Sequence, residues 1–341
     1  MKKIVVLSIL SISILIGFIF FSYYRQIYTT SITDKESYTF FIKNGESLFT
    51  TTQNLEDEGI IKSASLLRKY LSFKNIDTKV HAGIFTVYAP ITIASVVKVL
   101  DAPTYEERSL TFLPGWDLRN IGEYLEKQNI IKQKDFVKIV GETAKEKTKK
   151  TDFDDVILED LPSTLSLEGY LAPETFRFYL EDDAEIIVQK LINHRSSQFT
   201  QEMLDEIKRQ KKSIHEILTM ASLIEREVRG TEDRKKVSDI FWRRVTAGWG
   251  MQADSTIHYL TGKSGDVFTT KEDREIDSPW NTYKYRGLPP GPICTPSIDS
   301  IMAAIYPTKN DDWYFLTTFE GEVKYGVTLD EHNANVQKYL R

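Results

Sequence analysis

The stretch Ser213–Arg229, SIHEILTMASLIEREVR, decides the fold around it. Ser213 and Glu216 have the S-x-x-E spacing of a capping box, which predicts that a helix begins here. On a helical wheel Glu225 falls on the apolar face, whereas Glu227 falls on the far side, with the solvated residues. The apolar face consists of residues that recur at helical spacing: Ile214, Ile217, Leu218, Ala221, Ile224 and Val228.

A carboxyl on the buried face of a helix is costly unless it is paired with a cation or held protonated. A glutamate held protonated near neutral pH is what general acid catalysis requires, so Glu225 is a candidate catalytic acid. A core glutamate paired with an arginine from another element explains the same pattern. The helix alone leaves both interpretations open.

Composition excludes several classes of protein. A chain of 341 residues is typically two domains, and a net charge of −5 without a dense basic block argues against nucleic-acid binding. The single cysteine, Cys294, excludes an intrachain disulfide. We expect no Cys/His zinc site, and only an all-carboxylate metal site stays open, because the histidines are scattered: His81, His194, His215, His258 and His332.

The N-terminus has the pattern of a membrane anchor. Residues 4–24 are uncharged, and 21 residues in a helix span about 31 Å, enough to cross a bilayer core. Lys2 and Lys3 precede this run and Arg25 follows it, which predicts a cytoplasmic 1–3 tail and a body outside the membrane. Bulky aromatic residues stand where a cleavage site needs small ones, which disfavours a cleaved signal peptide. We expect a single-pass plasma-membrane protein whose body is periplasmic if an outer membrane is present.

An internal repeat with an offset of 70 residues follows a polar linker, 25–37. Each copy predicts a strand, a glycine turn, an amphipathic helix and an I-I-K exit. With a further helix and strand, the first copy forms a module over 38–103 that is similar to LysM-type wall-binding domains. The second copy and a connector occupy 104–165. Three blocks align without a gap: Gly45–Leu48 with Gly115–Leu118, Leu55–Glu56 with Leu125–Glu126, and Ile60–Lys62 with Ile130–Lys132.

Beyond the repeat, three stretches place polar and aromatic groups on predicted loops. Gly169 and Pro173 break regular structure in the first, and Pro289 and Pro290 stiffen the third. Donors beside aromatic faces suit a carbohydrate ring, and they equally suit turn capping and loop packing. The stretches are Ser166–Phe176 (SLEGYLAPETF), Met251–Thr256 (MQADST) and Ser278–Pro292 (SPWNTYKYRGLPPGP).

The remaining elements predict a mixed α+β body. A helix begins at Thr295–Pro296 with proline at its first position, and a hairpin turns around Gly321. The other predicted helices cover 184–209, 232–247 and 330–340.

Together these residues make the chain similar to the endolytic murein transglycosylases of the MltG (YceG-like) family. The resemblance implies an α+β fold with an N-terminal transmembrane helix, a small LysM-like βα module and a larger mixed α+β catalytic domain over 166–341. Ala253 and Ser255 depart from the usual pattern of the family, and the strand 325–328 is looser, which affects subsite detail and not the reaction class. The matching blocks are SLEGYLAPETF, ASLIERE, MQADST, NTYKYRGLPPGPICTPS and EHN.

The resemblance implies one catalytic glutamate, at the position that matches Glu225. We reject Glu227 at this stage because residues two apart on a helix point to different faces. Glu225 would protonate the glycosidic oxygen between N-acetylmuramic acid and N-acetylglucosamine. As a carboxylate it would then take the proton of the muramyl C6 hydroxyl, which attacks C1 of the same sugar and gives a 1,6-anhydro end. The reaction needs neither a metal nor an organic cofactor.

The resemblance also implies residues that hold the substrate, a glycan strand of peptidoglycan. For each, a support role in packing the loops is the alternative. A peptidoglycan synthase complex is a candidate partner, because the anchor would hold the body near nascent strands, and cleavage there would end strand elongation. The implied substrate-binding residues are Gln252, Asp254, Asn281 and Tyr283, with Glu168 and Tyr170 from a neighbouring loop.

Two alternatives remain. The first is a hydrolase of the same bond, which needs a second carboxylate from Glu168, Asp254 or Glu174. The second is a non-enzymatic wall-binding scaffold, in which the LysM-like module is the function and Glu225 is structural. The ends of the products separate the two enzymes, since one makes an anhydro end and the other a reducing end.

Overall fold

The computed structural model divides the chain into two compact units. Unit 1 comprises residues 1–108 with 177–181, and unit 2 comprises 109–176 with 182–341. Met1, Gly45 of the repeat, residues 30–35 of the linker, and residues 143–152 and 154 of the connector lie outside the described residues. The structure describes residues 2–29, 36–42, 46–76, 83–101, 107–142, 153, 155–180, 182–262 and 269–341.

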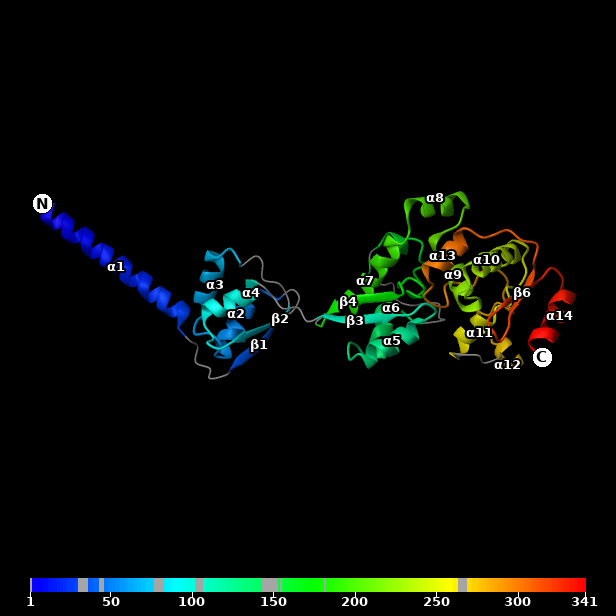
Figure 1. The fold of residues 1–341 in the computed structure, drawn as a ribbon, viewed down its shortest axis with the longest axis horizontal. Helices are drawn as coiled ribbons and strands as arrows, with labels where there is room; N and C mark the ends of the chain where they lie inside the picture. Colours follow the sequence, from blue (N-terminus) through cyan, green and yellow to red (C-terminus); the bar gives the residue numbers. More distant parts are fainter. Residues whose placement is uncertain are drawn as a thin grey trace. The chain divides into compact units, whose positions relative to one another are not determined.

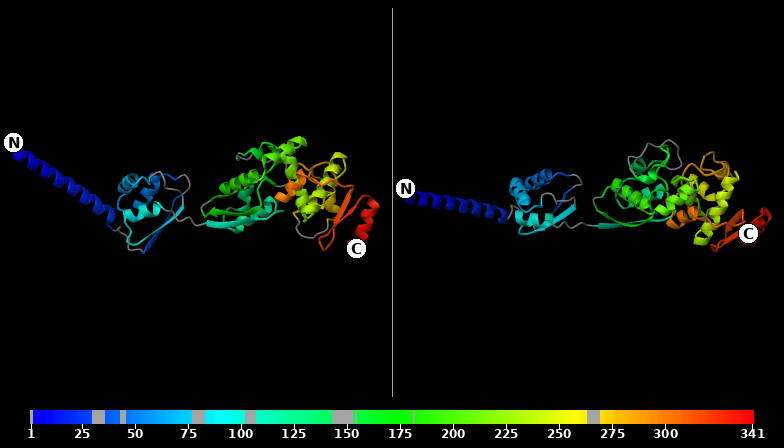
Figure 2. Two further views of the ribbon diagram at one scale, coloured as in Figure 1. Left: turned by 45° about the horizontal axis from the view of Figure 1, so that its top comes forward. Right: turned by 90° about the horizontal axis from the view of Figure 1, so that it is seen from above.

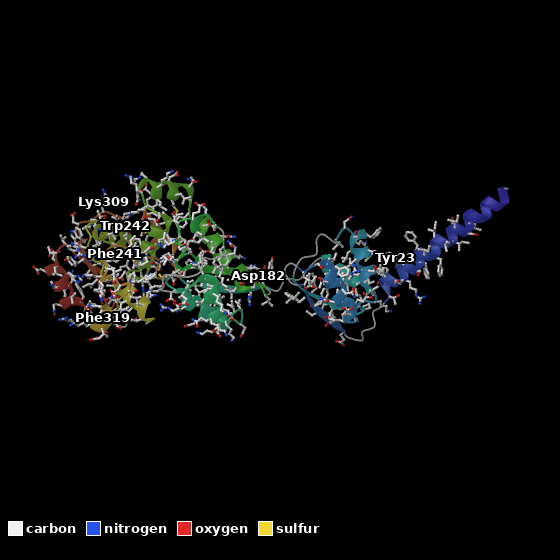
Figure 3. All side chains as sticks on the ribbon, turned by 180° about the vertical axis from the view of Figure 1, so that it is seen from behind. Tyr23, Asp182, Phe241, Trp242, Lys309 and Phe319 are labelled. Atoms are coloured by element: carbon white, nitrogen blue, oxygen red, sulfur yellow. The ribbon has the colours of Figure 1, made fainter. Side chains whose placement is uncertain are left out.

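Unit 1 begins with the long helix α1 (Lys2–Tyr28), on which Tyr23 lies (Figures 1 and 3). Its segment Leu10–Tyr28 is long and apolar enough to cross a membrane, a property that signal sequences share. The helix extends four residues beyond the predicted span. Ile27, in its last turn, is only 3% exposed because it packs into the core of unit 1. The described part of the predicted linker therefore begins as helix.

The rest of unit 1 is a two-stranded antiparallel sheet with helices. Ser37 pairs with Tyr88 and Ile42 with Gly83, so the strands run in register along their whole length. The core forms between this sheet and the helices, from residues such as Leu67, Phe85 and Val96. The elements are β1 (Ser37–Ile42), α2 (Leu48–Asp57), α3 (Ala64–Phe73), β2 (Gly83–Tyr88) and α4 (Ile93–Asp101).

The second copy of the repeat has the same β-α-α-β order, and its two strands pair with each other. The first helix of each copy starts at an equivalent residue, Ser47 or Asp117, whose side chain accepts a backbone N–H of the first turn. The structure therefore extends the repeat to a second helix and a second strand. The elements are β3 (Glu107–Phe112), α5 (Leu118–Lys127), α6 (Gln133–Val140) and β4 (Glu174–Tyr179).

Most of the second copy belongs to unit 2, with the helical body that follows it (Figure 2). At the centre α9 packs against α10, α11 and α13. The elements are a short 3-10 helix (Val156–Leu158), α7 (Ala184–Ser197), α8 (Gln201–Arg209), α9 (Ile214–Glu227), α10 (Thr231–Thr246), α11 (Asp254–Thr261), α12 (Lys271–Arg274), α13 (Ile298–Ile305), β5 (Tyr314–Thr317), β6 (Val323–Gly326) and α14 (Leu329–Tyr339).

The main sequence predictions for unit 2 are confirmed, with three differences. Ser213 and Glu216 form the predicted capping box of α9, and the predicted hairpin is present as β5 and β6. The stretch Ser166–Phe176 was predicted as a loop, but strand β4 begins within it, at Glu174. The stretch MQADST was predicted as a turn, but Asp254 begins the helix α11, which is too short for a clear helical pattern. Pro296 precedes α13 instead of opening it, because the Ser297 hydroxyl accepts the N–H of Ser300 and caps the helix one residue later.

Candidate active site

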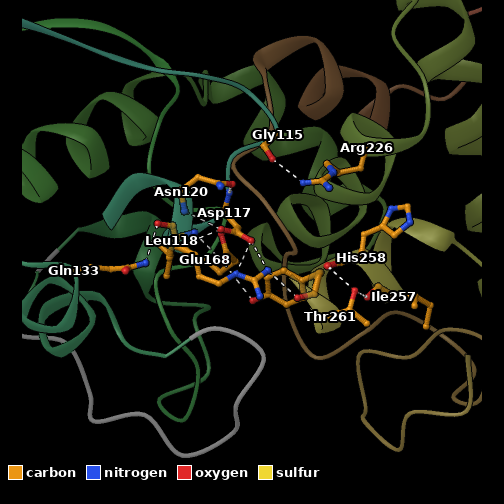
Figure 4. A network of polar contacts seen from close by, with 12 residues as sticks. Gly115, Asp117, Leu118, Asn120, Gln133, Glu168, Arg226, Ile257, His258 and Thr261 are labelled. Carbon is orange, nitrogen blue, oxygen red and sulfur yellow. Dashed lines mark hydrogen bonds and ion pairs between the residues drawn. The ribbon is translucent and has the colours of Figure 1, made fainter. Parts of the chain in front are cut away.

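The last turn of α9 carries three charged residues in succession, and each has different partners. Arg226 lies between Glu225 and Glu227, and its Nη1 donates to the carbonyl of Gly115 at 3.0 Å (Figure 4). The backbone of Gly115 also donates to Thr295 O, at 2.8 Å. The turn of the second repeat copy is thus fixed to the end of α9 and to the loop before α13.

Glu225 faces the start of α13. Its Oε2 accepts the backbone N–H of Ser297 at 2.9 Å and the hydroxyls of Ser297 and Ser300 at 2.5 and 2.7 Å. Its Oε1 accepts from Nη2 of Arg234 at 3.1 Å, and the side chains of Glu225 and Arg234 are only 7% and 11% exposed. In all four hydrogen bonds the carboxylate of Glu225 is the acceptor, and one of the donors is the cation of Arg234. This is the pattern of a structural ion pair that joins α9, α10 and α13.

Glu227 faces the start of α11. Its Oε1 accepts the backbone N–H of Ser255 at 3.4 Å. Burial raises the pKa of the Glu227 carboxyl, and the nearby negative charge of Asp254 raises it further, while hydrogen bonding by Ser255 and the charge of Arg244 act in the opposite direction. Glu227 is also the last residue of α9, where the negative end of the helix dipole disfavours a carboxylate. These surroundings favour the protonated form of the carboxyl, the form that a general acid needs.

The expectation that Glu227 lies among solvated residues is wrong. Its side chain is half-buried, because other elements cover the last turn of α9. Ser255 of α11 lies on one side, and the hydroxyl of Thr317 in β5 donates to the backbone oxygen of Glu227 at 3.2 Å. A helical wheel describes one helix in isolation and does not include these neighbours.

Asp254 and Tyr283 lie together beside Glu227. The Tyr283 hydroxyl donates to Asp254 Oδ1 at 2.7 Å, and the Thr269 hydroxyl donates to the same oxygen at 2.7 Å. Arg274 lies 4.8 Å above the Tyr283 ring. The pKa of Tyr283 is raised, first by burial and then by Asp254, so the phenol keeps its proton and donates. The side chain of Asp254 is 45% exposed and therefore accessible to a substrate.

Gln252 is exposed and has a strained backbone. Its φ of +54° is rare for a residue with a side chain, and such strain persists only where the surroundings fix it. Its N–H donates to Thr282 O at 3.2 Å, and the next N–H, that of Ala253, donates to the Thr282 hydroxyl at 3.1 Å. The turn that carries Gln252 is thus held against the loop that carries Tyr283.

Asn281 is fully buried and shapes that loop from within. Its amide donates to the carbonyls of Arg274 and Ile276 at 2.9 and 2.7 Å, and its Oδ1 accepts the N–H of Tyr283 at 3.0 Å. With these contacts made, the side chain positions Tyr283 and is covered from solvent. These contacts favour the support role of Asn281 over the predicted contact with the substrate.

Glu168 is also covered, in a network at the start of α5 (Figure 4). It is 3% exposed, and its Oε2 accepts the N–H of Leu118 and the hydroxyl of Tyr259, both at 3.3 Å. Burial raises the pKa of its carboxyl well above the usual value, and the charge of Asp117 adds to this shift. Arg119 pairs with Asp117 and donates to Tyr259 O. Glu168 joins α5 to α11, and at 3% exposed it presents almost no surface to a glycan.

Tyr170, predicted as a substrate contact, is 0% exposed. Nε2 of His215 lies 2.7 Å from Pro290 O, a pure acceptor, so Nε2 carries the proton and Nδ1 accepts from the Tyr170 hydroxyl at 2.8 Å. Burial lowers the pKa of His215 and keeps the ring neutral. This chain of bonds supports the proline-rich loop, and at Gly169 a Cβ would lie 2.4 Å from Pro292.

The structure therefore brings three of the predicted substrate-binding residues, Gln252, Asp254 and Tyr283, to the end of α9. Sequence reasoning missed Glu227 and Arg244 as members of this site. One signal for Glu227 was present in the sequence, because it lies three residues before Gly230, a residue type that often follows a helix, and helix ends are where other elements approach.

Comparison with known proteins places the chain in a family. The model of the YceG-like family matches residues 40–338. A protein of Bacillus subtilis named endolytic murein transglycosylase is 33% identical over 305 residues, which are 88% of this chain and 84% of that protein. One of the same name from Streptococcus pneumoniae is 28% identical over 90% of this chain, which spans 59% of that longer protein.

A solved structure is also similar to this chain. The crystal structure of a YceG-like protein of Listeria monocytogenes is similar to this chain with a TM-score of 0.57 and 32% sequence identity. The similarity covers 88% of this chain and 99% of the Listeria chain.

Proposed function

The chain belongs to the YceG-like family, and from that premise we propose that it is a lytic transglycosylase that cleaves peptidoglycan strands internally with a single acid, Glu227. The named relatives support murein as the substrate. The observation that carries the choice of residue is the environment of Glu227. Its pKa is raised by burial and by Asp254, and Gln252 and Tyr283 lie on the elements next to it.

The reaction needs one group that acts as an acid and then as a base. Glu227 gives its proton to the glycosidic oxygen between N-acetylmuramic acid and N-acetylglucosamine as the C1–O bond breaks. The carboxylate then takes the proton of the muramyl C6 hydroxyl while O6 bonds to C1. No water is consumed, and Glu227 ends protonated again. The hydroxyl attacks within its own sugar, so the step gains the rate advantage of an intramolecular reaction.

Asp254 suits a supporting role in this reaction. Its negative charge raises the pKa of Glu227, and beside the acid it would stabilise the positive charge that develops on the sugar in the transition state. Tyr283 and Thr269 hold one oxygen of Asp254 in place, at 2.7 Å each. The exposed side chain of Gln252 is the polar group we assign to hydrogen bonds with the sugar.

Glu225, the residue matched to the catalytic position from the sequence, suits the acid role less well. Its two oxygens already accept four hydrogen bonds, including one from the buried Arg234. To approach a sugar it would have to leave α13. We therefore propose Glu225 as the residue that holds α9 and α13 together behind the site.

We also propose the setting of the reaction. Helix α1 would anchor the chain in the plasma membrane with the N-terminus in the cytoplasm and the body outside, where nascent strands are made. Cleavage there would end strand elongation, and a synthase complex is the expected kind of partner. The β-α-α-β module of unit 1, which the sequence likens to LysM domains, would bind the wall.

A hydrolase of the same bond is the second candidate, because Asp254 is a carboxylate that acts electrostatically on Glu227. The other two candidates for a second carboxylate are less suited. Glu168 is covered, and Glu174 is on β4, where its carboxylate pairs with His194 of α7 at 3.1 Å.

The experiment is a digest of purified peptidoglycan by the full-length protein in detergent, with products read by mass spectrometry. Internal fragments that end in anhydro-muramic acid, one water lighter than hydrolytic products, support the transglycosylase. Fragments that end in ordinary reducing sugars would instead support the hydrolase. If the folded protein binds peptidoglycan but releases no fragments from mature or nascent strands, both enzyme interpretations are wrong and the wall-binding scaffold is supported.

A further inference from the structure

A row of aromatic rings lies on unit 2 near the candidate site. The ring centroid of Trp249 is 4.9 Å from that of Trp313 and 6.2 Å from that of Tyr314. Tyr314 stacks on His332 of α14 at 5.4 Å and 26°. Trp249 is 43% exposed, and the other three are half-buried. These four residues are called the aromatic row below.

The turn that carries Trp249 has an unusual backbone. Gly248 has a φ of +67°, which glycine adopts freely, and Gln252 has a φ of +54°, which is rare for a residue with a side chain. At Gly250 a Cβ would lie 3.2 Å from the backbone oxygen of Thr282. Met251 is fully buried, whereas Trp249 and Gln252 are exposed on either side of it. The turn therefore displays one aromatic ring and one amide to solvent.

A single guanidinium connects this row to the candidate acid. Arg244 is 7% exposed, and its Nη1 donates to Met251 O at 2.6 Å. Its Nε and Nη2 both donate to Trp313 O, at 3.1 and 2.6 Å. The same cation acts on the carboxyl of Glu227. The turn of Trp249, the start of β5 and the acid thus share one buried charged group.

We propose that the aromatic row is a sugar-binding subsite, which holds a ring of the glycan strand beyond the scissile bond. The ligand class is a chain of β-1,4-linked N-acetylhexosamines, whose ring faces carry C–H groups that pack on an aromatic face. Their hydroxyl and acetamido groups offer hydrogen bonds to Gln252. The subsite rests on the proposed function for its place in the reaction, because the row would position the strand that Glu227 cleaves.

Ordinary packing accounts for only part of the row. Trp313 and Tyr314 are half-buried because the hairpin lies on α10, where Arg243 stacks on Trp313 at 4.7 Å. Packing gives no reason for an exposed Trp249 on a strained turn. Phe319 is a matched comparison, because it is an exposed aromatic residue (71%) on the turn between β5 and β6, outside the row (Figure 3).

The experiment measures binding separately from cleavage. Full-length protein in detergent, with Glu227→Gln to stop turnover, is titrated with the hexamer of N-acetylglucosamine by calorimetry. Adding Trp249→Ala should raise Kd about tenfold, which corresponds to ~1.4 kcal/mol. Adding Trp249→Phe should restore most of the affinity because an aromatic face remains. Adding Phe319→Ala should leave Kd within about twofold, since Phe319 is outside the row.

Equal affinities for the Trp249→Ala and Phe319→Ala proteins would overturn the subsite, and so would a parent that binds no hexamer. Melting curves of the variants exclude a folding defect. If Trp249→Ala does not fold, Trp249→Leu, which removes the aromatic face and keeps an apolar side chain, gives the answer through a raised Kd. The digest of the wild-type protein is independent. If the wild type makes anhydro ends and Trp249→Ala binds the hexamer as tightly as its parent, the subsite is wrong and the proposed activity stands. If Trp249→Ala loses hexamer binding and the wild type makes no anhydro ends, the subsite stands and the proposed activity is wrong.

Discussion

Glu225 and Glu227 are two residues apart at the end of α9, yet their carboxyls have opposite surroundings. Glu225 faces the start of α13, where a backbone N–H, two hydroxyls and Arg234 all donate to it. Glu227 faces the start of α11, with a longer hydrogen bond from Ser255 and with both the negative charge of Asp254 and the positive charge of Arg244 nearby. Both are removed from bulk water. Burial alone therefore does not identify an acid, because four donors, one of them cationic, bind the buried Glu225, whereas burial together with Asp254 raises the pKa of Glu227.

The largest expected effect is the loss of activity in Glu227→Gln. The amide has no proton of the required acidity to give, so the initial rate of strand cleavage should fall by about 10³-fold. The melting midpoint should stay the same or rise, because the change removes a buried carboxyl whose pKa is raised. Rates from mass spectrometry and melting curves in one buffer check both parts. If the Glu227→Gln protein cleaves at the wild-type rate, Glu227 is not the catalytic acid.

Glu225→Gln should instead affect stability. The change leaves the buried guanidinium of Arg234 without its charged partner, and breaking a buried ion pair costs about 3 kcal/mol. We expect the melting midpoint of unit 2 to fall by several degrees, while the rate per folded molecule stays within about threefold of wild type. Ser300→Ala, which removes one neutral donor, is the milder control. Unchanged melting with activity lost would assign the acid role to Glu225.

Asp254→Asn should move the pH dependence of cleavage. The Asp254 carboxylate raises the pKa of Glu227, so its removal lowers that pKa, and the protonated acid is lost at a lower pH. The falling limb of kcat/KM should therefore shift to lower pH. Tyr283→Phe keeps the charge of Asp254 and should leave the limb in place. If the falling limb stays at the same pH in Asp254→Asn, the charge of Asp254 does not set the pKa of the catalytic acid.

The smallest effect concerns Glu168, a third buried carboxyl away from the acid. Its pKa is raised in the folded protein, so the folded state binds the proton more tightly than the unfolded state. Stability of the wild type therefore falls as pH rises from the ordinary value of 4.5 towards the raised pKa, and the loss persists above it. Glutamine does not titrate.

The melting difference between Glu168→Gln and wild type should accordingly grow with pH across this window and then level off. Melting curves from roughly pH 5 to 9 measure it. A difference that is constant with pH would mean that Glu168 does not titrate differently on folding.

Several elements were predictable because their signals are local. The capping box at Ser213, the hairpin around Gly321 and the repeated strand–turn–helix units depend on residues close in sequence, and the structure has all three. The site was predictable only in part. Gln252, Asp254 and Tyr283 belong to stretches chosen for their polar groups, and these do lie at the end of α9.

The rest depended on contacts that a sequence does not place. The wheel of α9 assigned Glu227 to solvent because it excluded α11 and β5, which cover that turn. Asn281 and Tyr170 come from stretches with the right composition, but sharp loops need internal hydrogen bonds, and these side chains supply them. Composition identified the loops, and the structure separates the residues that support them from those that are exposed.

The most direct test of the account compares the two carboxyls in one digest. Glu225→Gln and Glu227→Gln proteins, each first shown to be folded at the assay temperature, are incubated with the same peptidoglycan, and anhydro-muramic ends are counted by mass spectrometry. The account predicts anhydro ends from Glu225→Gln and none above background from Glu227→Gln. Anhydro ends from Glu227→Gln and none from folded Glu225→Gln would contradict it and return the acid role to Glu225.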